Sequence, residues 1–183
     1  MTERPKSPEP SSWVVRFLPM IRANGDVLDL ACGNGRHSLP LATAGFHVTA
    51  LDRDVTELPI NNFIKPVEAN LEDGSPWPLS GQDFDGIVVT NYLHRPLFPI
   101  LIESLRPGAI LIYETFSIGN ELIGRPRNPD FLLQDGELLQ AVSGKLRVVA
   151  YEAGSVDKPA PAVVQRISAI KPSESHDFIQ LPI

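Results

Sequence analysis

The sequence is poor in cysteine, in long apolar runs and in clustered basic residues, which a disulfide, a membrane-spanning helix and a polyanion-binding surface respectively require. Its 183 residues include a single cysteine, Cys32, which excludes an internal disulfide and indicates a reducing compartment. No apolar run approaches the roughly 20 residues of a membrane-spanning helix, and the N-terminus carries no apolar signal-peptide segment. The formal net charge is −6 and the arginines are scattered, which argues against a nucleic-acid partner. We therefore expect a cytoplasmic protein without a nucleic-acid or membrane partner.

The length and composition indicate one globular domain. Hydrophobic residues make up 43% of the chain and charged residues 21%, which is ordinary for a protein with a buried core. Three prolines among charged residues predict a disordered lead-in over residues 1–10. We expect the single domain to span residues 11–172, followed by a C-terminal tail over 173–183.

The chain is organised around residues 27–35. Residues 27–31 form a short apolar run typical of a buried strand, and a turn with Gly33 and Gly35 follows it. A glycine turn after a strand lets the backbone approach a nucleotide-like ligand closely, because glycine has no Cβ. Asp52 closes the next apolar run, where a carboxylate can accept hydrogen bonds from both hydroxyls of a ribose.

The glycine pattern distinguishes between two cofactor classes. A dinucleotide site has the pattern G-x-G-x-x-G, but Ser38 stands at the third glycine position. The pattern Asp29-x-Ala31-x-Gly33-x-Gly35 instead resembles the first motif of class I S-adenosylmethionine (SAM)-dependent methyltransferases, with Ala31 in place of the first glycine. This resemblance implies that Asp29 helps to hold the methionine end of the cofactor. The alternative is a strand aspartate that caps a neighbouring loop.

The pattern of apolar runs predicts an α/β protein with a seven-stranded, mostly parallel sheet. The expected strands are 27–31, 47–51, 64–69, 84–90, 109–116, 146–150 and 163–170. Helices are expected over 36–44, from Pro96 onward, from Asn128 or Asp130 through Val142, and from Ser11 or Ser12 through Met20, with one or two helical turns within 53–62. The N-terminal helix is expected to pack on the sheet, or alternatively to form part of a lid over the substrate. The last two strands, joined by a loop, correspond to the antiparallel hairpin of Rossmann-like class I methyltransferases.

Four longer segments indicate a more specific group within this class of methyltransferases. Residues 28–37, 91–97, 113–116 and 124–133 together are similar to small bacterial methyltransferases, often described as tellurite-resistance-type or simply SAM-dependent methyltransferases. The similarity covers roughly residues 25–170. It implies the class I fold and SAM as the cofactor, bound at the carboxyl ends of the first three strands, but it does not specify a substrate.

The remaining predicted cofactor residues follow the second, third and fourth strands. Asp52 and its neighbour Arg53 follow the second strand. By resemblance, Asn70 is expected to bind the adenine amino group and Leu71 to hold the ring, whereas the alternative is an ordinary polar turn. Asn91 follows the fourth strand, at the edge of the sheet where ligands bind in such folds.

Methyl transfer depends mainly on alignment and on the exclusion of water, so no catalytic triad is required. The catalytic candidates are His94, which could take a proton from the acceptor, and Tyr92, which could cover the methionine part of the cofactor. Both have a purely structural alternative. The candidates for binding an anionic acceptor are Arg95, Glu114, Arg125 and Arg127. The alternative for the arginines is a solvated surface, and a buried Glu114 would need an arginine as its partner.

The sequence therefore predicts a SAM-dependent methyltransferase with a small-molecule acceptor, since the chain is acidic and shows no added domain for a macromolecule. Three alternatives stay open: a SAM-binding regulatory or partner protein without turnover, a methyltransferase that acts on a protein or RNA, and an NAD(P)-binding protein. One cysteine and four histidines without ligand spacing predict no metal site. A homodimer is neither predicted nor excluded.

Overall fold

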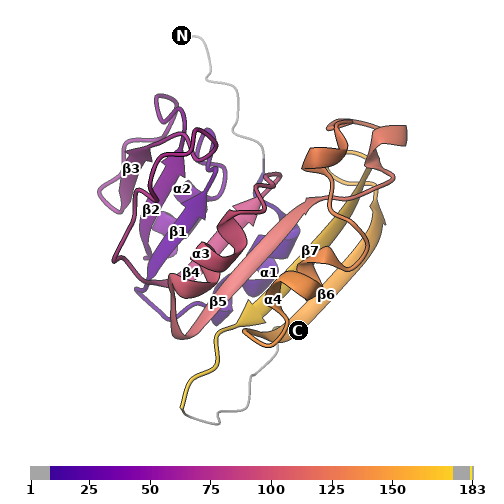
Figure 1. Cartoon of the computed structure of the whole chain (residues 1–183). Helices are drawn as coiled ribbons and strands as arrows, with labels where there is room; N and C mark the ends of the chain where they lie inside the picture. The colour runs from indigo at the N-terminus through magenta and orange to yellow at the C-terminus, as the bar shows by residue number, and fades with distance from the viewer. Residues whose placement is uncertain (1–8, 175–181, 183) are drawn as a thin grey trace.

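A seven-stranded sheet in the order β3-β2-β1-β4-β5-β7-β6 runs through the molecule (Figure 1). The computed structural model describes residues 9–174 and 182. The strands are β1 (Asp26–Leu30), β2 (His47–Asp52), β3 (Ile64–Glu68), β4 (Phe84–Thr90), β5 (Leu105–Phe116), β6 (Arg147–Val156) and β7 (Ala162–Ile170). The first five strands pair in parallel, whereas β7 is antiparallel to both β5 and β6. This arrangement confirms the predicted fold class and its antiparallel hairpin.

Both faces of the sheet are covered, and the side chains of the central strands alternate between two cores. In β4, Ile87 and Val89 belong to one apolar cluster and Val88 to the other, as the period of two along a strand requires. Every residue of β4 is buried. Pro66 lies on β3 at the edge of the sheet, where the missing N–H removes no bond within the sheet.

Short helices cover the two faces. They are α1 (Ser12–Phe17), α2 (Ser38–Thr43), α3 (Leu97–Glu103) and α4 (Glu137–Val142), with 3₁₀ turns η1 (Leu18–Met20), η2 (Asn120–Leu122) and η3 (Pro129–Phe131). Apolar residues of α1 and α2 join one core cluster, and those of α3 and α4 join the other. Figure 1 shows α3 and α4 in front of the sheet and α1 behind it. The predicted packing of the N-terminal helix on the sheet is therefore present.

Three predicted helices differ from the structure. Ser11 caps α1 as expected, since its Oγ accepts a bond from the Trp13 N–H, but the last predicted turn is the 3₁₀ helix η1. The helix expected to run through Val142 is divided, because Gly136 has a φ of +68° that is incompatible with a continuous helix. Residues 53–62 contain turns and no helix.

The hairpin is larger than predicted. The strand β6 runs to Val156, six residues beyond its expected end, and pairs with β7 from Arg147 to Val156. Most of β6 is exposed or half-buried, so its sequence lacks the apolar run that reveals a buried strand. The hairpin therefore projects beyond the rest of the sheet, as the orange strands in Figure 1 show.

The predicted lead-in over 1–10 and tail over 173–183 lie largely outside the described residues. Within residues 9–174, no helix combines the length and the apolar character that crossing a bilayer would require. Over the same residues, the side chains of His, Cys, Asp and Glu form no group of three that could hold a metal ion.

Candidate functional site

Two cavities lie at the carboxyl ends of the parallel strands, where ligands bind in open α/β sheets. The first cavity has a volume of about 370 Å³ and is formed by the residues that follow β1, β2, β3 and β4. Seven of the residues predicted to bind cofactor or act in catalysis line it: Ala31, Asp52, Arg53, Asn70, Leu71, Asn91 and Tyr92. The structure thus brings together side chains from four separate segments of the chain.

Asp52 joins the end of β2 to the glycine turn. Its Oδ2 accepts a hydrogen bond of 2.8 Å from the Gly33 N–H, and its Oδ1 accepts one of 3.2 Å from the Asp54 N–H. A carboxylate has about four lone-pair positions, so both oxygens can still accept a bond from a ligand. The two bonds thus fix the Asp52 carboxylate and leave it able to accept further hydrogen bonds.

The turn after β1 uses left-handed backbone at three positions. Ala31, Gly33 and Gly35 have φ values of +54°, +54° and +80°. A Cβ on Gly35 would lie 2.9 Å from both the Leu58 and the Pro59 side chains, whereas one on Gly33 would meet open space. Packing against residues 58–59 therefore requires the glycine at 35. Ala31 accepts a strain of roughly 1–2 kcal/mol that glycine would avoid.

Asp29 lies beneath this turn and does not line the first cavity. It is 1% exposed, and the Ser38 hydroxyl at the start of α2 donates a bond of 2.6 Å to its Oδ2. Burial raises the pKa of Asp29 to about 7, against the lowering effects of Ser38 and Arg36. This placement supports the alternative in which the strand aspartate fixes a neighbouring segment.

The loop after β3 contributes one residue that the sequence did not single out. Glu72 lines the first cavity beside the predicted Asn70 and Leu71. The Oδ1 of Asn70 already accepts a bond of 3.0 Å from the Glu72 N–H, which fixes the orientation of the amide. The Glu72 carboxylate therefore adds a second hydrogen-bond acceptor to this part of the cavity wall. Its position in the same polar loop was the only signal in the sequence.

The two predicted catalytic residues line different hollows. The Tyr92 ring lines the first cavity, but burial and the neighbouring Glu72 carboxylate raise the pKa of its hydroxyl above the usual value, so the hydroxyl stays protonated near neutral pH. His94 lines a hollow between residues 69–78 and the start of α3, which shares residues 69–72 with the first cavity, but His94 lines neither of the two cavities. Its catalytic role stays a prediction.

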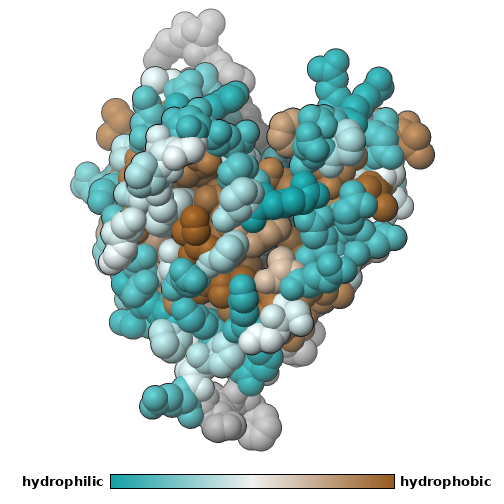
Figure 2. Space-filling model, viewed as in Figure 1, coloured by the Kyte–Doolittle hydropathy of each residue, from teal (hydrophilic) through white to brown (hydrophobic). Residues whose placement is uncertain are grey.

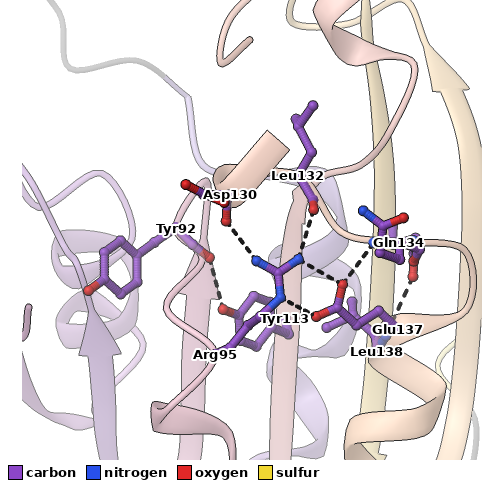
Figure 3. A network of polar contacts seen from close by, with 9 residues as sticks. Tyr92, Arg95, Tyr113, Asp130, Leu132, Gln134, Glu137 and Leu138 are labelled. Atoms are coloured by element: carbon purple, nitrogen blue, oxygen red, sulfur yellow. Dashed lines mark hydrogen bonds and ion pairs between the residues drawn. The ribbon is translucent and has the colours of Figure 1, made fainter. Parts of the chain in front are cut away.

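The predicted role of Arg95 in binding an acceptor differs from its place in the structure, because internal contacts use its guanidinium (Figure 3). Its Nε and Nη2 donate to the Glu137 carboxylate at 2.6 and 3.0 Å, and Nη1 and Nη2 donate to the carbonyl oxygens of Asp130 and Leu132 at 2.7 and 2.9 Å. Glu137 further accepts a bond of 2.8 Å from the Gln134 N–H. Arg95 therefore ties the segment after β4 to the segment that leads into α4, and it lines neither of the two cavities.

Replacing Arg95 with lysine should destabilise the fold by about 1–2 kcal/mol, because an ammonium cannot reproduce the paired bonds to Glu137 and the two bonds to carbonyls. Urea unfolding measures this loss. The matched control is Arg127→Lys, since Arg127 is exposed and makes one long bond of 3.4 Å to the Gly124 carbonyl. If Arg95→Lys left stability unchanged and weakened substrate binding instead, the structural role would be wrong.

The second cavity has a volume of about 850 Å³ and meets the first at Asn91, which lines both. Its walls come from residues 9–12, the ends of β5 and β7, residues 123–125 and residues 156–162. Figure 2 shows the molecule hollowed at its upper edge, between the part built on β1–β4 and the projecting hairpin. Of the predicted acceptor residues, Glu114 and Arg125 line this cavity, whereas Arg95 and Arg127 do not.

Glu114 has an arginine partner, as a buried carboxylate requires, but the partner was not among the predicted arginines. Arg166 on β7 lies opposite Glu114 in the antiparallel pairing with β5, and its Nε is 2.7 Å from the Glu114 Oε2. Both side chains are less than 15% exposed. Nothing local in the sequence identifies Arg166, because the pairing depends on the register of two strands about fifty residues apart.

A buried histidine links the N-terminal helix to this region. The Nε2 of His37 accepts a bond of 3.1 Å from the Ser11 N–H, so the ring proton lies on Nδ1, which faces the Thr90 hydroxyl at 3.4 Å. The Arg36 guanidinium donates to the same hydroxyl at 3.2 Å. Burial, with a smaller effect of Arg36, lowers the pKa of His37 to about 3. His37 is thus a neutral connector between the start of α1 and the end of β4.

The fold agrees with that of known methyltransferases. By structure, the chain is similar to TehB from Haemophilus influenzae, with a TM-score of 0.68, 19% identity, 86% of this chain covered and 61% of that one. It is also similar to the glycopeptide N-methyltransferase MtfA in complex with S-adenosyl-L-homocysteine, with a TM-score of 0.63, 17% identity, and 90% and 91% of the two chains covered. These likenesses establish the fold.

Sequence comparison establishes the family. The chain is 27% identical over 126 residues to "Putative methyltransferase YqeM" of Bacillus subtilis (strain 168), a match that covers 58% of this chain and about half (47%) of that protein. The family model described as "Methyltransferase domain" matches residues 3–122, which is more than half of the chain. The chain therefore belongs to the methyltransferase-domain family, in agreement with the SAM-dependent class I methyltransferase predicted from its sequence.

Proposed function

We propose that the chain transfers a methyl group from SAM to a small-molecule acceptor. The observation that carries this proposal is the first cavity, in which Asp52 stands at the tip of β2 and residues 70–72 stand after β3. In this proposal Asp52 holds the ribose hydroxyls, and Asn70, Leu71 and Glu72 hold the adenine. Arg53 closes the cavity beside Asp52.

The residues present fit a bound SAM in two respects. Both oxygens of Asp52 keep acceptor capacity after their bonds to backbone N–H groups. The space beside Gly33 is open, so a ligand can lie directly against the backbone of the turn. Asn91, where the two cavities meet, would be the residue to hold the methionine end.

Bound SAM would supply an activated methyl group that the acceptor's nucleophilic atom could take from the sulfonium, with the electron pair left on sulfur and any proton on the nucleophile released to water. The contribution of this chain is to align the two reactants and to exclude bulk water. The Tyr92 ring and Asn91 are placed to do so at the junction of the cavities. No side chain needs to act as a base.

A small-molecule acceptor is supported by the size of the second cavity. Its volume of about 850 Å³ lies within the range of roughly 300–1,000 Å³ typical of sites for small organic ligands. The single cysteine supports a cytoplasmic location for this activity. One of the structural relatives is described as a glycopeptide N-methyltransferase, an enzyme whose named acceptor is not a nucleic acid.

A SAM-binding protein without turnover is the second candidate function. One observation favours it for acceptors that must lose a proton before they react: His94, the predicted base, lines neither cavity. Under this alternative the protein binds SAM but transfers no methyl group to any acceptor in a broad screen.

Calorimetric titration with SAM, S-adenosylhomocysteine and NADH tests the proposed cofactor. We expect dissociation constants in the micromolar range for the first two ligands and no binding of NADH, because Ser38 replaces the third glycine of a dinucleotide site. Tight NADH binding without a response to SAM would overturn the proposal. Transfer of a labelled methyl group from SAM to an acceptor would then separate the enzyme from the non-catalytic alternative.

A further inference from the structure

We infer that the second cavity binds an amphipathic organic anion, a small molecule with an apolar body and a carboxylate or phosphate head group. The inference rests on the proposed function, because it assigns this cavity to the methyl acceptor. It adds the chemical class of that acceptor, which the fold leaves open.

The charge of the cavity walls differs in sign from the charge of the protein. Among the described residues, four cationic side chains line the cavity against two carboxylates, Glu9 and Glu114, which gives these residues a net charge of +2 in a chain whose net charge is −6. The four cations are Arg36, Arg125, Lys158 and Arg166. Clefts lined by one sign of charge raise the local concentration of the opposite ion, so this cavity attracts anions.

Most of these cations are available to a ligand. Arg166 is occupied, since it pairs with Glu114 at 2.7 Å and with Glu152 at 3.4 Å. In the described part of the chain, Arg36, Arg125 and Lys158 form no salt bridge, and the hydrogen bond from Arg36 goes to the neutral Thr90 hydroxyl. The pairing of Glu114 with Arg166 also removes the carboxylate on β5 that would repel an anion.

The cations come from different parts of the fold. Arg36 follows the glycine turn, Arg125 lies in the segment after η2, and Lys158 lies in the β6–β7 loop. Side chains that converge from three separate segments can surround one anionic group, and two guanidinium groups can each bind it through paired N–H donors.

Much of the rest of the wall is apolar. Phe116, Val164 and Val156 of the sheet, Ile123 after η2, and residues 159–162 of the hairpin loop line the same cavity. A bare inorganic oxyanion would make no use of this surface, whereas an aliphatic or aromatic body would bury it from water. The combination of free cations and an apolar wall therefore indicates an organic anion.

Calorimetry on the full chain saturated with S-adenosylhomocysteine tests the inference. The probes are phenylacetate, indole-3-acetate, octanoate and phenyl phosphate, the neutral amides of the three carboxylates, and sodium tellurite and arsenite. We expect at least one organic anion to bind roughly tenfold more tightly than its neutral counterpart, with an affinity that falls as salt is added. Comparison of phenylacetate with phenyl phosphate decides between the two head groups.

A matched set of variants ties any binding to this cavity. The double variant Arg125→Gln/Lys158→Gln should weaken the binding of the anion by roughly three- to tenfold and leave the neutral amide within about twofold. Arg127→Gln is the control, because Arg127 has the same charge two residues away in the same exposed segment and does not line the cavity. It should change neither affinity by more than about twofold.

Three outcomes would overturn the inference: equal affinities for acids and amides, binding of tellurite or arsenite without any organic acid, or no binding of any organic anion. Failure of the proposed function is recognised separately, because S-adenosylhomocysteine would then not bind in the first titration. The same panel of probes, titrated into the protein without S-adenosylhomocysteine, would in that case still decide the chemistry of the cavity.

Discussion

Replacing Asp52 with alanine should weaken SAM binding by more than tenfold. A charged acceptor that bonds the ribose hydroxyls contributes roughly 1.5–3 kcal/mol, and 1.4 kcal/mol corresponds to a factor of ten in the dissociation constant. The substitution also removes the acceptor of the Gly33 N–H bond of 2.8 Å, which holds the turn against β2. The loss is measured by calorimetric titration of each variant with SAM and with S-adenosylhomocysteine.

Two further variants separate the ligand contact from the support of the turn. Asp52→Asn keeps an oxygen for the Gly33 N–H but loses the charge and one acceptor, so its affinity should fall between those of the unmodified protein and Asp52→Ala. Asp54→Ala is the matched control, because the Asp54 carboxylate is exposed and bonds to Thr56 rather than lining the cavity. If Asp54→Ala lost affinity and Asp52→Ala kept it, the ribose contact would belong to Asp54.

Most residues of the first cavity could be predicted from the sequence, because they stand at or just after the carboxyl ends of parallel strands. Parallel strands place their carboxyl ends at the same edge of the sheet, so the residue after each strand is close to the others whatever the exact register. Asp52, Asn70 and Asn91 meet in the first cavity for this reason. Recognition of the strands was therefore sufficient to collect these residues.

The second cavity depends on long-range pairing of strands and could not be predicted in the same way. Arg166 meets Glu114 only through the antiparallel register of β7 with β5. Lys158 reaches the second cavity because the largely exposed strand β6 extends the hairpin, and an exposed edge strand leaves no apolar signature. Arg95 was assigned to the substrate because the sequence did not reveal Glu137 as its partner.

Burial decides which way two residues near the glycine turn face. Asp29 stands in the strand motif and His37 directly follows the glycine turn, yet both are almost completely inaccessible, at 1% and 2% exposure. Spacing shows that such residues are near a turn, but not whether they face the ligand or the core. In this protein both face inward. Burial raises the pKa of Asp29 and lowers the pKa of His37.

The pH dependence of stability should reveal these two residues as a compensating pair in the protein without ligand. Between about pH 4.5 and 6, folded Asp29 is protonated and folded His37 is neutral, given pKa values of about 7 and about 3. In the unfolded chain over the same range, the aspartate is ionised and the histidine is protonated. Compared with the unfolded chain, the folded protein binds one more proton at Asp29 and one fewer at His37. Their contributions to the slope of the free energy of unfolding against pH therefore cancel.

Single substitutions should expose the two slopes with opposite signs. In Asp29→Asn the histidine acts alone, and since the unfolded state then binds the extra proton, the free energy of unfolding should rise with pH by up to about 1.4 kcal/mol per unit relative to the unmodified protein. In His37→Gln the aspartate acts alone, and the free energy of unfolding should fall with pH by a similar amount. Urea unfolding at half-unit intervals from pH 4.5 to 6 measures both slopes.

The double variant Asp29→Asn/His37→Gln serves as the control for this pair. All other titrating groups are common to the four proteins, so the double variant should have the slope of the unmodified protein even though its absolute stability differs. Parallel slopes in all four proteins would mean that neither group titrates abnormally in the folded state. The buried bonds from Ser38 to Asp29 and from Ser11 to His37 would then be structural contacts without linkage to protons.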